Sequence, residues 1–134
     1  MTKQYAVPYV NFSGSDREAL EFYQKVLGGE LRLYARGKAE QAGPEDRVSY
    51  GRLDVNGTPL LVGSDGHPSY PPTVGDHIAI TLGGTDKEKM SKIFGDLADG
   101  GQVKGPLSPQ PWGGEFGYLH DRFGINWVVS VDPG

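Results

Sequence analysis

Two side chains of this sequence, His77 and Glu115, have the chemistry to move a proton at a bound molecule. His77 begins a strand predicted at residues 77–82, and the ordinary pKa of an imidazole, about 6.5, suits it to act as a general base or a ligand contact. The alternative is a hydrogen-bonded histidine that is retained with the fold and has no chemical role. Glu115 would need burial to raise its pKa into a useful range for a general base. The favoured alternative is a solvated turn residue.

A second group of residues could hold a small molecule without reacting with it. Two glycines follow Trp112 and would let the indole and the backbone approach a ligand closely, or Trp112 could plug the end of a sheet. Polar side chains on predicted strands could serve as handles in a mainly apolar pocket, and His120 either joins them or belongs to the adjoining turn. The predicted ligand-binding residues are Tyr9, Asn11, Thr81, Trp112, Tyr118 and Asn126.

Composition excludes several classes of protein. The sequence has no cysteine, so disulfides, thiolate metal sites and cysteine nucleophiles are excluded. Its 13 basic and 17 acidic residues give a net charge of −4, which argues against a nucleic-acid partner. No apolar run approaches the roughly 18 residues that span a bilayer, and the first residues lack the apolar stretch of a signal peptide. We therefore expect a cytoplasmic protein with neither a nucleic-acid nor a membrane partner.

The elements that position these residues come from an internal repeat. Residues 7–18 and 77–88 both read as a strand that runs into a helix, with capping boxes predicted at residues 15–18 and 85–88. Paired glycines stop both helices. The pair Asn56-Gly57 predicts a hairpin turn. The remaining strands are predicted at residues 31–36, 48–55, 59–62, from 103, at 116–120 and at 125–131, with loops at 37–46, 63–76 and 106–114.

The resulting order is βαβββ twice. It predicts an α+β fold in which residues 1–134 form a single domain from two halves, about 5–64 and 76–132. We expect two four-stranded mixed sheets curved into a trough, with the helices on the outside. Alternation along the strands predicts that Val10, Phe12, Ile78, Ile80 and Leu82 pack under the helices. The same alternation predicts that Val7, Tyr9, Asn11, His77, Ala79 and Thr81 line the trough.

Several segments resemble the vicinal oxygen chelate superfamily, which contains glyoxalase I, extradiol dioxygenases, fosfomycin resistance enzymes and bleomycin-binding proteins. The sequence is most similar to its PhnB-like branch. The segments that carry the resemblance are PYVNF at 8–12, REALEFY at 17–23, LGG at 27–29, DHIAI at 76–80, WGGEFG at 112–117 and DRFGINW at 121–127. The resemblance implies a glyoxalase-like fold, but not one particular activity, because this fold supports many chemistries.

Metal-dependent members of the superfamily use four cavity-facing ligands, one on the first and one on the last strand of each half. Carried onto this chain by the resemblance and the repeat, these positions are Val7 (or Pro8), Leu61, His77 and Val128. Only His77 can bind a metal, whereas a bound divalent ion needs at least three protein ligands. We therefore predict no metal site and no cofactor.

Three interpretations of the function remain. The leading one is a metal-free homodimer that binds a small, partly apolar or aromatic molecule, as the bleomycin-binding members do. The alternative is a metal-dependent glyoxalase or dioxygenase-type lyase or oxidoreductase that uses His77. A dimer module with a filled trough is a third interpretation.

Overall fold

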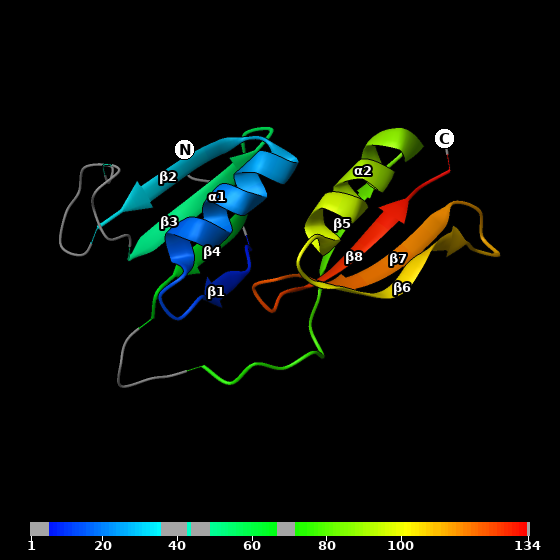
Figure 1. The fold of residues 1–134 in the computed structure, drawn as a ribbon. Helices are drawn as coiled ribbons and strands as arrows, with labels where there is room; N and C mark the ends of the chain where they lie inside the picture. The colour runs from blue at the N-terminus through cyan, green and yellow to red at the C-terminus, as the bar shows by residue number, and fades with distance from the viewer. Residues whose placement is uncertain (1–5, 36–42, 44–48, 67–71, 134) are drawn as a thin grey trace. The chain divides into compact units, whose positions relative to one another are not determined.

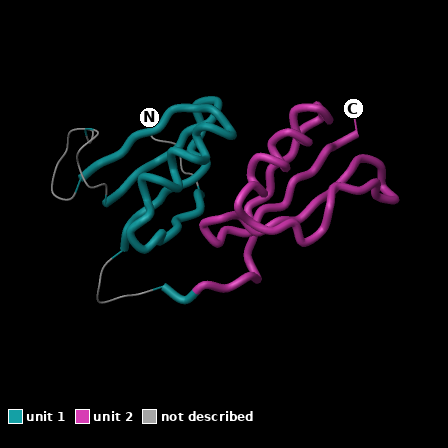
Figure 2. The backbone as a smooth tube through the Cα atoms, viewed as in Figure 1, with its two compact units in different colours: residues 1–73 teal, residues 74–134 magenta. Residues whose placement is uncertain are grey.

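The computed structural model describes residues 6–35, 43, 49–66 and 72–133. The chain divides into two compact units, Met1–Thr73 and Val74–Gly134, coloured separately in Figure 2. We call them unit 1 and unit 2. Their boundary falls in the connection predicted between the two halves. That the two units form one domain with a shared trough stays a prediction.

Unit 1 contains a four-stranded mixed sheet and one helix. Its elements are β1 (Tyr9–Asn11), α1 (Asp16–Leu27), β2 (Glu30–Tyr34), β3 (Tyr50–Val55) and β4 (Thr58–Ser64). The strand order is β1-β4-β3-β2, in which β1 and β4 are parallel and the other pairs are antiparallel. Figure 1 shows α1 lying on one face of this sheet.

Unit 2 repeats this arrangement. Its elements are β5 (Ile80–Gly84), α2 (Lys87–Ala98), β6 (Gln102–Pro109), β7 (Glu115–His120) and β8 (Asn126–Val131). The strand order β5-β8-β7-β6 matches that of unit 1, with β5 and β8 parallel (Figure 1). The predicted α+β fold with the βαβββ order twice is therefore confirmed.

Each helix buries one apolar side against its own sheet. In unit 1, Leu20 and Tyr23 of α1 are fully buried with Leu53 and Leu61 of the sheet. Gly63 allows this packing, because a Cβ there would collide with Phe12 and Asp16. In unit 2 the buried residues of α2 are Met90, Phe94 and Leu97, and those of its sheet include Leu119, Trp127, Val129 and Val131. None of the helices in the described ranges is long and apolar enough to cross a membrane.

The predicted hairpin at Asn56-Gly57 is confirmed. Both residues have positive φ, 55° and 76°, which is the backbone that a two-residue turn of this kind requires. Asn and Gly adopt it at little cost, so the turn could be predicted from two residues.

Four sequence predictions about unit 2 are wrong. The strand predicted at residues 77–82 begins at Ile80, and Ile78, predicted to pack under a helix, is 72% exposed. The cap of α2 is Asp86 and not Thr85, because the Asp86 carboxylate accepts the Lys89 backbone N–H at 3.1 Å. Strand β6 extends to Pro109, into the predicted proline-rich loop. The prolines are accommodated because β6 is an edge strand with register shifts between Val103 and Ser108.

Candidate functional site

The face of the unit 2 sheet that points away from α2, here called the helix-free face, gathers most of the candidate residues of this unit. Gly117 and Leu119 of β7 point toward α2, since a Cβ on Gly117 would contact Phe94 and Leu119 is fully buried. Because side chains alternate along a strand, Phe116, Tyr118 and His120 point to the helix-free face. Their β8 partners Ser130, Val128 and Asn126 share that face, and Thr81 of β5 joins it opposite Val128.

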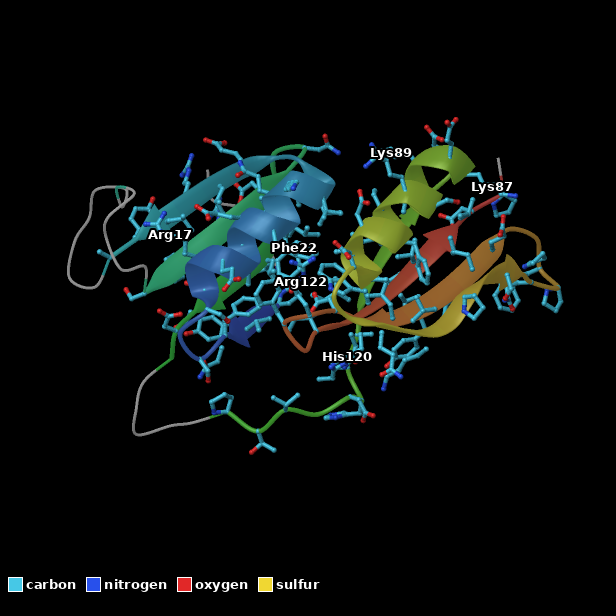
Figure 3. The ribbon with its side chains drawn as sticks, viewed as in Figure 1. Arg17, Phe22, Lys87, Lys89, His120 and Arg122 are labelled. Atoms are coloured by element: carbon cyan, nitrogen blue, oxygen red, sulfur yellow. The ribbon has the colours of Figure 1, made fainter. Side chains whose placement is uncertain are left out.

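His120 and Asn126 form a polar pair at one end of this face. They sit opposite each other at the ends of β7 and β8, and His120 Nδ1 lies 2.9 Å from Asn126 Oδ1. Asn126 is buried whereas His120, labelled in Figure 3, is half-buried. The pair therefore places one imidazole edge within reach of a molecule on the face.

Residues 74–78, here called the strap, cross this polar end before β5 begins. The Asn126 side-chain amide donates to the backbone carbonyls of Gly75 (3.3 Å) and Ile78 (3.1 Å). The Tyr118 hydroxyl donates to the Asp76 carbonyl at 3.4 Å. The strap carries His77, which is exposed in a bend and not on a strand. Tyr118 and Asn126 thus bond the backbone on either side of His77. His77, Tyr118 and Asn126 are all predicted site residues.

Glu115 lies apart from this polar end. It is the first residue of β7, and its carboxylate forms an ion pair with Lys87 at 3.0 Å, at the first turn of α2. An ion pair with an exposed lysine satisfies the carboxylate and favours a structural role over that of a general base.

Trp112 does not plug the end of the sheet, because its side chain is 71% exposed. It sits in the turn between β6 and β7, which is closed by hydrogen bonds between Gly113 N and Gln110 O (3.0 Å) and between Gln110 N and Gly114 O (3.1 Å). The indole is therefore presented to solvent on a tight turn and remains available for a ligand.

Tyr9 and Asn11, the two predicted ligand-binding residues of unit 1, both lie on β1. Tyr9 is exposed, whereas Asn11 is half-buried and its Oδ1 accepts the Ser13 backbone N–H at 2.9 Å. That bond holds the turn between β1 and α1. Asn11 therefore has a structural partner, and Tyr9 has an open aromatic ring.

The four positions carried over as metal ligands do not fit a metal ion. Leu61 was predicted to face the cavity, which is wrong: it is fully buried and shares the α1 side of its sheet with Leu53. Val128 does lie on the helix-free face, but its side chain offers no donor atom. Within the described part of the chain no group of three or more histidine, aspartate or glutamate side chains could hold an ion.

Asp16 is an unusual residue that no sequence pattern marks. Its side chain is fully buried at the start of α1, and neither carboxylate oxygen has a hydrogen-bond partner among the described residues. Burial, and secondly the charge of Asp65, raises the pKa of Asp16 to about 7. By contrast, hydrogen bonds from Arg52 at 2.7 and 2.8 Å lower the pKa of the Asp54 carboxyl.

The His120–Asn126 pair was also not identified as a unit, although one signal could have found it. Residues 116, 118 and 120 alternate through one predicted strand, so His120 belongs to the same face as Tyr118. The partner across the hairpin depends on the loop at residues 121–125. Asp121 orders that loop by accepting hydrogen bonds from Phe123 N, Ile125 N and Trp127 Nε1.

Comparison with known proteins places this fold. The model of the family described as 3-demethylubiquinone-9 3-methyltransferase matches residues 4–130. The crystal structure of protein PA1353 from Pseudomonas aeruginosa is 35% identical, with a TM-score of 0.85 over 98% of this chain and 100% of that one. Protein YjdN of Escherichia coli K12 is 26% identical over 92% of each chain.

A further solved structure, described as a putative 3-demethylubiquinone-9 3-methyltransferase, PhnB protein, from Bacillus cereus, shares the fold. It has a TM-score of 0.73 at 22% identity, over 95% of this chain and 98% of that one. The chain therefore belongs to the family described as 3-demethylubiquinone-9 3-methyltransferase.

Proposed function

We propose that this protein binds a small, partly aromatic molecule on the helix-free face of unit 2, without a catalytic metal. The observation that supports it is the row of Phe116, Tyr118 and His120 along β7, on a face that α2 does not cover. Phe116 is 39% exposed, although β7 is an inner strand of its four-stranded sheet. An exposed aromatic in that position is typical of a binding surface.

Apolar contact would supply most of the binding free energy. Covering apolar surface contributes roughly 25 cal/mol per Å², and a planar ring on Phe116 and Tyr118 also gains the preferred offset or edge-to-face geometry. The hydroxyl of Tyr118 and the amide of Asn126 already bond the strap. Their proposed role is therefore to shape the site, while Thr81 and Trp112 supply further contact.

A thermal-shift screen tests this proposal. The panel should contain phenols, quinones, aromatic amines and, because the family description names a methyltransferase, S-adenosylmethionine. A compound at 100 times its dissociation constant should stabilise the fold by about 2.7 kcal/mol. We expect aromatic compounds to shift the melting temperature of the natural chain.

The matched variants are Phe116→Ser and Tyr50→Ser, because Tyr50 of unit 1 has nearly the same exposure, 40% against 39%. Phe116→Ser should abolish the shift and Tyr50→Ser should keep it. Equal loss in both variants, or no shift with any compound, would contradict the proposal and favour a module with no ligand.

The metal-dependent alternative gains no support from the donor atoms at the four carried positions. Elemental analysis of protein purified without chelator tests it directly. About one metal ion per chain, lost in His77→Ala, would establish that alternative.

The homodimer and the cytoplasmic location are part of the proposal. The dimer rests on the resemblance to bleomycin-binding proteins. Light scattering coupled to size-exclusion chromatography should give twice the mass of one chain. A monomer at micromolar concentration would contradict the proposed homodimer.

A further inference from the structure

The geometry points to a fixed tautomer of His120: we infer that the neutral ring carries its proton on Nδ1 and presents Nε2 as a hydrogen-bond acceptor for an aromatic hydroxyl group. The tautomer follows from unit 2 alone. The class of ligand rests on the proposed function, because it requires the helix-free face to be the binding surface.

The orientation of the Asn126 amide is the first step. Its nitrogen faces two backbone carbonyls, those of Gly75 and Ile78, at 3.3 and 3.1 Å. Carbonyl oxygens only accept, so the amide group turned toward them must be the NH₂. A flipped amide would place its oxygen against two other oxygens and lose both bonds. The Oδ1 atom is therefore the one that faces His120.

The state of His120 follows from that orientation. Asn126 Oδ1 accepts only, and it lies 2.9 Å from His120 Nδ1, so Nδ1 must donate. In the neutral ring one nitrogen carries the proton and the other carries the lone pair, and the partner of one nitrogen fixes the role of the other. The lone pair is consequently on Nε2. Free histidine in water prefers the opposite tautomer, so the pair imposes a measurable change.

The surroundings of Nε2 define what it can bind. Among the residues that the structure describes, Asn126 is the one hydrogen-bond partner of the His120 side chain. The ring shares the helix-free face with Phe116 and Tyr118, and it is only half-buried. A ligand that places an aromatic ring on these two side chains would extend its edge toward Nε2. The complementary group at that edge is a donor, and a phenol-type hydroxyl meets both requirements.

Nitrogen NMR tests the tautomer without any ligand. In protein labelled with ¹⁵N-histidine, two-bond correlations distinguish a protonated from an unprotonated ring nitrogen, and His120→Gln assigns the His120 signals among the three histidines. At a pH where the ring is neutral we expect a protonated Nδ1 and an unprotonated Nε2. A protonated Nε2 would overturn the inference.

Two substitutions sharpen this measurement. Asn126→Ala should return His120 to the Nε2-protonated form, whereas Tyr118→Phe removes a different bond to the strap and should keep the tautomer. If Asn126→Ala does not fold, the spectra of the natural chain and of Tyr118→Phe still decide the matter.

A pair of probes tests the ligand class. We expect 2-naphthol to bind about tenfold more tightly than 2-methoxynaphthalene, because the methyl ether cannot donate, and His120→Leu should remove the difference. Equal binding of both probes to the natural chain would overturn the ligand class and leave the proposed function standing. Binding of neither probe would overturn the ligand class, while the proposed function is judged by the thermal-shift screen and the tautomer by NMR.

Discussion

Two buried aspartates, one in each unit, differ in the hydrogen-bond donors that surround their carboxylates. Asp121 of unit 2 is 2% exposed and accepts hydrogen bonds from Phe123 N (2.8 Å), Ile125 N (3.0 Å) and Trp127 Nε1 (2.8 Å). Asp16 of unit 1 is fully buried, and its two oxygens have no partner in the described part of the chain. The free energy of a buried carboxylate depends on the donors around it, so burial alone does not predict the effect of a substitution.

The position of Asp16 explains its isolation. Its own backbone N–H donates to Asp65 Oδ1 at 3.0 Å, so Asp65, the residue that follows β4, takes the place of a local cap for α1. The second carboxylate then raises the pKa of the first. Ser15, the predicted cap, donates instead to Phe12 O at 2.8 Å and makes no cap bond.

The largest expected effect is at Asp16. Its pKa rises from 3.8 to about 7 on folding. Below pH 3.8 both the folded and the unfolded chain hold the proton; as the pH rises toward 7, only the folded chain keeps it, so stability falls. The shift corresponds to about 4 kcal/mol, lost by pH 8. Asp16→Asn should therefore raise the free energy of unfolding at pH 8 far more than at pH 4, measured by urea denaturation with circular dichroism.

The control for that prediction is Asp86→Asn. Asp86 is the matching aspartate of the sequence repeat, but it is exposed and caps α2, and asparagine caps equally well. Its substitution keeps a side-chain oxygen for the Lys89 backbone N–H and should change the free energy of unfolding by less than about 1 kcal/mol. An Asp16→Asn variant with the same pH dependence as the natural chain would remove the contrast between the two buried aspartates.

Asp121 should respond in the opposite direction. Asp121→Ala leaves buried donors without an acceptor, so we expect a loss of about 3 kcal/mol in the free energy of unfolding. Asp99→Ala is the exposed comparison, because Asp99 pairs with Arg122 at 3.1 Å on the surface and should change stability by less than about 1 kcal/mol. Similar losses in both variants would show that the three bonds to Asp121 are not what stabilises the hairpin.

The helix caps give the smallest expected difference. Asp86→Ala removes a cap bond and should lower the free energy of unfolding by about 1 kcal/mol. Ser15→Ala removes a bond outside the helix and should have about half that effect. A larger loss at Ser15 than at Asp86 would show that α1 depends on a local cap after all. Urea denaturation of both variants under one set of conditions measures this difference.

Much of the fold could be predicted because local signals agree with the observed elements. The Asn56-Gly57 turn, the two amphipathic helices and the βαβββ order each follow from a few neighbouring residues. Leu61 lies four residues after Gly57, and Val128 lies four residues after Gly124. This equal spacing predicts that both side chains face the same way, and that prediction is wrong for Leu61. The first hairpin has a two-residue turn and a register shift at Leu53/Asp54, whereas the second has a loop ordered by Asp121. The count therefore ends on opposite faces.

The candidate site was predicted in part for the same reason. Tyr118 and Asn126 follow from strand alternation. The strap has no periodicity, so neither the exposed position of His77 nor the bonds from Asn126 to Gly75 and Ile78 could be inferred from its sequence. His120 becomes informative only when its partner across the hairpin is known.

The location of the tryptophans has a practical consequence for future work. Both tryptophans of the chain, Trp112 and Trp127, lie in unit 2, one on an exposed turn and one fully buried. Tryptophan fluorescence therefore reports on unit 2 alone, whereas tyrosine fluorescence reports on both units. If emission and backbone signals lose their native values at the same urea concentration, the two units unfold as one cooperative body; if emission changes separately, they are independent.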